Sequence, residues 1–273
     1  MNKFTGAGPY LYATAIAAFA IIQLVTQNFL TGLFPVSPTL PLRWVLMILS
    51  SGIFLVAAAG ILFHVRPQLA AVVAGWLFLV FFFVLYMPKV LGDLYNGGDW
   101  AGAFENLMLA SGAFIIASYF PSEMPGNERW TRMVIMANIF SRYGFAVSLL
   151  LFGIQHIIYF TYIETLIPVW LPAQAFWATI VTGAFLLSAI SFFSGWKIGL
   201  ASLLLGIMFG LWVIILHAPR AIGKGNVETE WSSLFVALGV CGVALTLARR
   251  YLTGPTGRVA VRHAELAGDI LSD

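Results

Sequence analysis

Two histidines of the chain, His156 and His217, fall inside or at the edge of long apolar stretches. Ionisable groups are costly in a membrane interior, so they are functional candidates by default. Histidine titrates at about pH 6.5 when unperturbed, and it can therefore exchange a proton near neutral pH. These two residues are the first candidates for ligand binding or proton transfer.

His156 lies in a stretch that contains glycine and tyrosine at helical spacing. Gly153 is three residues before it and Tyr159 three residues after it, so the three share one face of a helix, with Gln155 adjacent. Glycine at such a position permits close approach of another helix or of a flat ligand. Three interpretations remain open for His156: a hydrogen bond to a neighbouring helix, contact with a ligand or substrate, and ligation of a metal or haem.

His217 is followed by Ala-Pro219-Arg220, and Glu230-Trp231 comes shortly afterwards. We expect Pro219 to end the helix and Arg220 and Trp231 to lie at the membrane boundary, where anchoring is their ordinary role. The alternative is a shared site, because both histidines fall toward the same membrane face. The residues predicted to bind a quinone-like or lipid ligand there are His156, His217, Arg220, Gln155, Tyr159 and Trp231.

The composition indicates a membrane protein. Hydrophobic residues make up 60% of the chain and charged residues 9%, whereas about a quarter of the residues of a soluble domain are charged. Eight apolar stretches are long enough to span a bilayer as helices. The sequence therefore predicts an all-α polytopic bundle with spans at 10–30, 42–64, 69–92, 101–120, 139–162, 173–195, 198–218 and 230–251.

The distribution of basic residues predicts the orientation of the bundle. Ten lysines and arginines fall on one side and four on the other, so the positive-inside rule places both termini in the cytoplasm. The apolar loop 164–172 then lies outside, and we expect it to fold back over the outer ends of the helices. The ten residues are Lys3, Arg66, Arg129, Arg132, Arg142, Lys197, Arg249, Arg250, Arg258 and Arg262.

The second half of the chain repeats the first. The run 33–36 returns at 166–169, with Pro168 following Pro35 by 133 residues, and Pro219 follows Pro88 by 131. A tandem duplication explains this pattern. The predicted units are 1–120, a cytoplasmic linker 121–138, 139–252, and a cytoplasmic tail 253–273. Gln23 and Tyr86 stand at the repeat positions of the two histidines, so the site is predicted to belong mainly to 139–251.

Several kinds of chemistry find no support in the sequence. Cys241 is the single cysteine, which excludes an internal disulfide or a cysteine-held cluster. We find no phosphate-binding glycine loop, no metal-binding motif and no catalytic triad spacing. The basic residues gather at span ends, so nucleic acid is not a predicted partner. No cofactor is identified from the residues, and no cleaved signal peptide is expected.

The second half resembles the DoxX-like (DoxX/DoxD) integral membrane proteins, which are small four-helix units. The resemblance rests on the order of short motifs and covers the second unit well and the first in degraded form. It implies a bacterial inner-membrane location and an association with quinone-linked redox chemistry. The motifs are Gly153-Ile-Gln-His156, Leu-Ile-Pro168-Val-Trp-Leu-Pro172, Phe-Trp177, Thr182-Gly183, His217-Ala-Pro219-Arg220 and Glu230-Trp231.

Two hypotheses of different classes follow. In the first, the protein is an accessory or structural subunit of a larger membrane complex, respiratory or quinone-linked, without a redox centre of its own and surrounded by lipid and partner subunits. In the second, the outer group of residues binds a quinone or quinol head group, and a histidine takes up a proton while electrons pass to a partner subunit.

Overall fold

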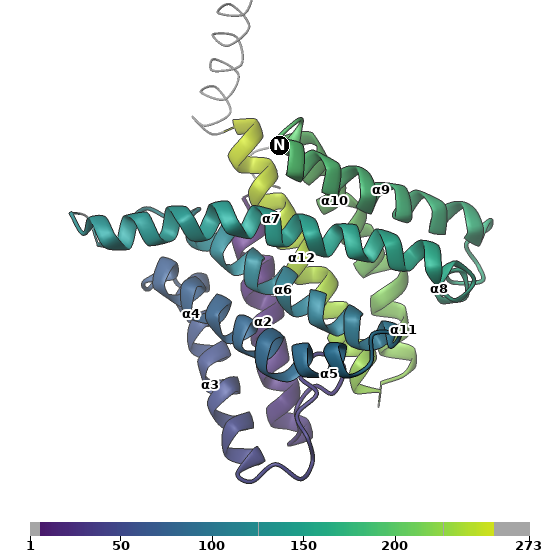
Figure 1. The fold of residues 1–273 in the computed structure, drawn as a ribbon, viewed down its shortest axis with the longest axis horizontal. Helices are drawn as coiled ribbons and strands as arrows, with labels where there is room; N and C mark the ends of the chain where they lie inside the picture. The colour runs from purple at the N-terminus through teal and green to yellow at the C-terminus, as the bar shows by residue number, and fades with distance from the viewer. Residues whose placement is uncertain (1–5, 125, 226, 254–273) are drawn as a thin grey trace, which may run out of the picture.

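The fold is described by a computed structural model that places residues 6–124, 126–225 and 227–253, all of whose regular structure is helical (Figure 1). The elements are α2 (Gly8–Thr26), α3 (Arg43–Leu62), α4 (Pro67–Val80), η1 (Phe81–Tyr86), α5 (Met87–Gly92), α6 (Gly97–Ala117), α7 (Glu128–Ile158), α8 (Phe160–Leu166), α9 (Gln174–Ser194), α10 (Ile198–Trp212), η2 (Val213–His217), α11 (Ala218–Gly223) and α12 (Glu228–Thr253).

Eight of these helical segments are long and apolar enough to cross a membrane. They coincide with the eight predicted spans to within a few residues, except that the fifth begins earlier. The predicted fold class, an all-α polytopic membrane bundle, is confirmed. In such a bundle the backbone hydrogen bonds are satisfied within each helix, which is a requirement inside lipid.

The helices form two quartets with the same internal order of packing. The first quartet contains α2, α3, α4 and α6, and the second contains α7, α9, α10 and α12; within each, every helix packs on the next. The quartets also exchange contacts, because α12 packs on α2 and α6 packs on α7. Since α6 and α12 contact each other as well, the fourth helices lie at the centre of the molecule, and they are the most buried of the eight spans.

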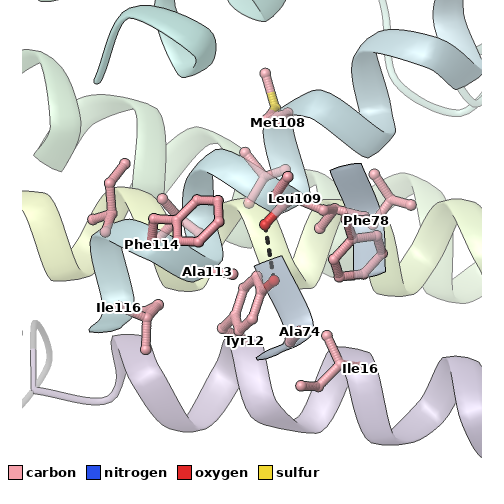
Figure 2. Close-up of a cluster of buried hydrophobic side chains, with 14 of the residues drawn as sticks. Tyr12, Ile16, Ala74, Phe78, Met108, Leu109, Ala113, Phe114 and Ile116 are labelled. Carbon is pink, nitrogen blue, oxygen red and sulfur yellow. Dashed lines mark hydrogen bonds between the residues drawn. The ribbon is translucent and has the colours of Figure 1, made fainter. Parts of the chain in front are cut away.

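The core between α2, α4 and α6 is tightly packed. The hydroxyl of Tyr12 is fully buried and donates a hydrogen bond of 2.8 Å to the carbonyl oxygen of Leu109, the contact marked in Figure 2. Phe78 and Ala113 lie around it (Figure 2). The main-chain carbonyl thus satisfies the one polar atom of this side chain, which would otherwise be costly to bury.

The backbone repeats unusual conformations at corresponding places in the two quartets. Leu42 and Ala173, which precede α3 and α9, both adopt left-handed conformations (φ 56° and 58°), and so do Arg66 and Lys197 before α4 and α10 (φ 48° and 57°). Each pair is separated by 131 residues. The two-residue change of spacing therefore falls in the loops before α3 and α9.

The π-helices η1 and η2 form another corresponding pair, and each precedes a proline, Pro88 or Pro219. Proline lacks an N–H and its ring clashes with the carbonyl four residues earlier, so a wider turn before it relieves the conflict. The seventh span consequently continues to Gly223. The expectation that Pro219 ends this helix was wrong, because the π-turn lets the chain pass through the proline.

The predicted linker 121–138 is largely ordered structure. Helix α7 begins at Glu128, and its first turns project beyond the other helices (Figure 1). Before it, the Glu123 carboxylate accepts hydrogen bonds from the N–H groups of Gln68 and Leu69 at the start of α4. The Trp130 indole donates to the Gln68 side chain at 2.6 Å. The predicted tail beyond Thr253 and the basic residues Lys3, Arg258 and Arg262 lie outside the described residues.

Candidate functional site

A cavity of about 750 Å³ lies within the second quartet and is closed on one side by α6 of the first. Its walls come from α6, α7, α8, α9, α10 with η2, and α12, and they are mainly apolar. Because α6 and α12 occupy the centre of the bundle, each can line a space that belongs to the opposite quartet. The predicted site residues that line this cavity are Gln155, His156, Tyr159 and His217.

His156 is held on α7 by its own backbone. Its Nδ1 lies 2.8 Å from the carbonyl oxygen of Phe152, one turn earlier, and its ring centroid lies 5.0 Å from that of Phe185 in an edge-to-face arrangement. Gly153 permits the close approach of α9, since a Cβ there would come within 2.5 Å of the Leu186 side chain. The glycine therefore serves helix packing, and the histidine beside it faces the cavity.

His217 reaches the same cavity from the last residue of η2. A π-turn carries extra residues per turn, so it rotates the following side chains relative to a continuous α-helix. No side-chain hydrogen bond of His217 is found among the described residues. The cavity thus brings together two histidines that are 61 positions apart in the chain.

Arg220 and Trp231 lie outside the cavity lining, although they were predicted to belong to the site. Arg220 and Lys224 both donate to the same carboxylate oxygen of Glu230, at 2.8 and 3.0 Å. The Trp231 indole donates to the carbonyl oxygen of Gly225 at 3.1 Å. These contacts fasten the turn between α11 and α12.

In the first quartet, an ion pair and an indole hydrogen bond hold the corresponding turn between α5 and α6. Lys89 is paired with Asp99 at 3.0 Å, and the Trp100 indole donates to the Leu94 carbonyl at 3.0 Å. The four residues each lie 131 positions before their counterparts in the second quartet, and the acid differs only in length, Asp99 matching Glu230. Ionisable residues are therefore present in both halves here, and these pairs belong to the scaffold.

Glu105 is the site residue that sequence reasoning missed. It is a half-buried acid on α6 that lines the cavity, and no ion pair or hydrogen bond of its carboxylate is found among the described residues. Its position within the span predicted at 101–120 was a sufficient signal, because an acid there is a candidate by default. The first quartet therefore contributes to the cavity, although most of the lining residues lie within the predicted range 139–251.

The corresponding region of the first quartet is filled by phenylalanines. Phe34 comes from the loop after α2, is fully buried, and packs with ring centroids 4.4 Å from Phe81 and 5.8 Å from Phe54. Ile167 occupies the matching loop position in the second quartet. The phenylalanines of this cluster are Phe19, Phe34, Phe54, Phe78 and Phe81.

The two loops take different paths. Phe29, Leu30 and Leu33 of the first loop are buried with Phe34. In the second quartet only part of the loop turns inward: Ile167 is 6% exposed, but Val169 is 93% exposed. The expectation that the apolar loop 164–172 folds back over the helices therefore holds for Ile167 but not for Val169 and Trp170, which are exposed.

In comparisons with known proteins, no family model, no curated protein and no solved structure matches the chain. The fold and the composition define an integral, multi-pass membrane protein. The cavity and its polar residues define the candidate site.

Proposed function

We propose that the protein binds a lipid-soluble ring compound of the quinone type in the cavity of the second quartet. The observation that carries the proposal is the contrast between this cavity, which contains two histidines, and the matching space of the first quartet, which Phe34 fills. Ligand sites are commonly apolar cavities of about 300–1,000 Å³ with a few polar groups. The cavity fits that description in size and in composition.

The walls suit a flat ring. Phe185, Phe209 and Trp212 line the cavity and present aromatic surface, and aromatic side chains favour offset or edge contacts with another ring. The resemblance to DoxX-like proteins supplies the chemical class, a quinone, and the bacterial inner membrane. The distribution of basic residues places both termini in the cytoplasm. These assignments belong to the proposal.

A fluorescence titration tests the proposal. Trp212 lines the cavity. Binding of a short-chain benzoquinone to the purified protein should therefore quench the fluorescence of Trp212, and this quenching should disappear in Trp212→Phe. We expect His156→Ala and His217→Ala each to weaken binding by about tenfold, the value of one lost hydrogen bond in an apolar site.

His64 provides the matched control. It lies outside this cavity, where the Tyr10 hydroxyl lies 2.7 Å from its Nε2, so His64→Ala should leave the affinity unchanged. A wild-type protein that neither retains quinone on purification nor binds it in titration would contradict the proposal. Equal weakening by all three histidine variants would point to a general loss of structure instead.

We also propose that the protein acts as a subunit of a larger membrane complex. The supporting observation is the start of α7, which projects beyond the other helices (Figure 1) and exposes Ile135, Met136 and Phe140. A projecting apolar turn gains by packing against another membrane helix. Purification in mild detergent should recover one defined partner, and Phe140→Ala together with Ile135→Ala should reduce its recovery. Recovery of the protein alone would contradict this second proposal.

A further inference from the structure

Three polar side chains that line the cavity, those of Gln155, His156 and Ser233, use a hydrogen-bond donor on the protein's own main chain. This distribution bears on which form of a ligand the cavity can hold, and the inference drawn from it rests on the proposed function. A buried polar group that finds no partner costs free energy, so the ligand must complement the groups that remain.

His156 presents an acceptor to the cavity. Its Nδ1 lies 2.8 Å from the Phe152 carbonyl oxygen, and a carbonyl can only accept, so the proton is on Nδ1. In the neutral ring the other nitrogen, Nε2, then carries a lone pair. No described residue donates to it, and the lone pair is left for the ligand.

Gln155 and Ser233 repeat this arrangement. The Gln155 amide nitrogen donates to the carbonyl oxygen of Gly97 at 2.8 Å, and the Ser233 hydroxyl donates to that of Thr229 at 2.9 Å. The Gln155 amide oxygen and the lone pairs of the Ser233 hydroxyl remain as acceptors. Both residues line the cavity.

Glu105 adds the strongest acceptor. An ionised carboxylate has acceptor atoms only, and even a protonated carboxyl keeps one. Its side chain faces the cavity without a cation beside it, since no lysine or arginine is present among the described residues that line this space. Arg220 and Lys224 are occupied by Glu230 outside the lining. A phosphate or another anion would therefore find no complement here.

We propose that the cavity selects a ligand whose ring carries hydroxyl groups, with Glu105 as the residue that determines this preference. Hydroxyl groups donate to Glu105 in its ionised form, to His156 and to Gln155, whereas ring carbonyls can only accept and would leave these atoms unpaired. Tyr159 and His217 can serve either form, because each can donate or accept. The reduced, dihydroxy form of a quinone-type ring is therefore bound in preference to the dicarbonyl form.

Calorimetric titration of the purified full-length protein under anaerobic conditions tests this preference. The probes are an alkyl 1,4-dihydroxybenzene, its 1,4-dimethoxy analogue and the corresponding benzoquinone, which share one ring and differ in their donors. We expect the dihydroxy compound to bind at least about tenfold more tightly than the other two, which corresponds to one unpaired acceptor avoided.

Two variants of Glu105 separate its role from a structural one. Glu105→Leu should remove most of the preference by weakening only the dihydroxy compound, and Glu105→Gln should restore part of it, because an amide oxygen also accepts. Glu164 is an acid on α8 outside the cavity lining, and Glu164→Gln should leave all three affinities unchanged.

The outcomes distinguish this inference from the function on which it rests. Equal affinities for the three compounds, or tighter binding of the benzoquinone, would overturn the preference while the cavity remained a quinone-type site. A preference that survives in Glu105→Leu would overturn the assignment to Glu105. Failure of all three compounds to bind would remove both the preference and the proposed function.

Discussion

The two quartets share a scaffold and differ in what occupies its interior. In the first, the loop after α2 enters the bundle and three side chains hold it: Tyr86 donates to the Gly32 carbonyl at 2.5 Å and Asn106 to the Leu33 carbonyl at 2.8 Å, while Glu228 of α12 accepts from the N–H and hydroxyl of Thr31. The loop is thereby fixed at consecutive residues.

The second quartet lacks each of these anchors. The residues at the corresponding positions are His217 for Tyr86, Ala237 for Asn106 and Gly97 for Glu228, all at a spacing of 131. All three line the cavity. The substitutions that release the loop are therefore the ones that open the space, and one of them adds a histidine to it. The two interiors therefore differ by a few side chains and by the path of one loop, on helices that keep the same order of packing.

Removal of the filling residue should show the largest difference between the quartets. We expect Phe34→Ala to lower the free energy of unfolding by about 3–5 kcal/mol, because it deletes a fully buried ring from a packed cluster. Ile167→Ala at the matching position should cost less than half as much, since its surroundings already border open space. Thermal unfolding of both variants in one detergent measures this, and equal losses would contradict the comparison.

Filling the open cavity should reproduce the first quartet in the second. Ile167→Phe introduces the ring that Phe34 supplies in the first loop, and we expect the affinity for the quinone-type ligand to fall by about tenfold or more, because ligand and ring compete for one volume. Val169 is 93% exposed in the same loop, so Val169→Phe is the control. Unchanged binding in Ile167→Phe would show that the ligand lies elsewhere.

Hydropathy was sufficient to predict the architecture but not this contrast. Eight apolar stretches fix eight helices, since lipid leaves few alternatives for an apolar chain of that length. Hydropathy does not determine whether a short apolar loop turns into the bundle. The loops 29–36 and 164–172 are alike in composition, yet only the first is held inside by hydrogen bonds. The anchors lie on helices far away in the sequence, and one of them, Glu228, belongs to the other quartet.

The residues of the candidate site could likewise be predicted only in part. His156 and His217 stand out because charge is rare in their stretches, and the structure places both on one cavity. Arg220 and Trp231 were included through their nearness in the sequence, but their partners are Glu230 and Gly225. Glu105 was overlooked because the ligand site was sought within one half of the chain. The exchange of packing between the halves, α6 on α7, is a property of the assembled bundle.

A single anchor of the first loop should have a moderate effect. Tyr86→Phe removes the part-buried hydrogen bond to the Gly32 carbonyl, so we expect a loss of about 1 kcal/mol in stability. Tyr95 is 94% exposed and its hydroxyl bonds no described residue, so Tyr95→Phe should be neutral. A neutral Tyr86→Phe would mean that packing alone holds the loop in place.

Loss of the ion pair that both quartets have at this turn should have the smallest effect on stability. Lys89→Met breaks the pair with Asp99, in which the side chains are 45% and 14% exposed, and we expect a loss of about 0.2–1 kcal/mol, as for other exposed pairs. Arg132→Met removes a pair with Glu128 that is still more exposed, at 79% and 81%, and it should be closer to neutral. Ligand affinity should stay unchanged in Lys89→Met, because this pair lies outside the cavity lining; weaker binding would show that the scaffold and the site are coupled.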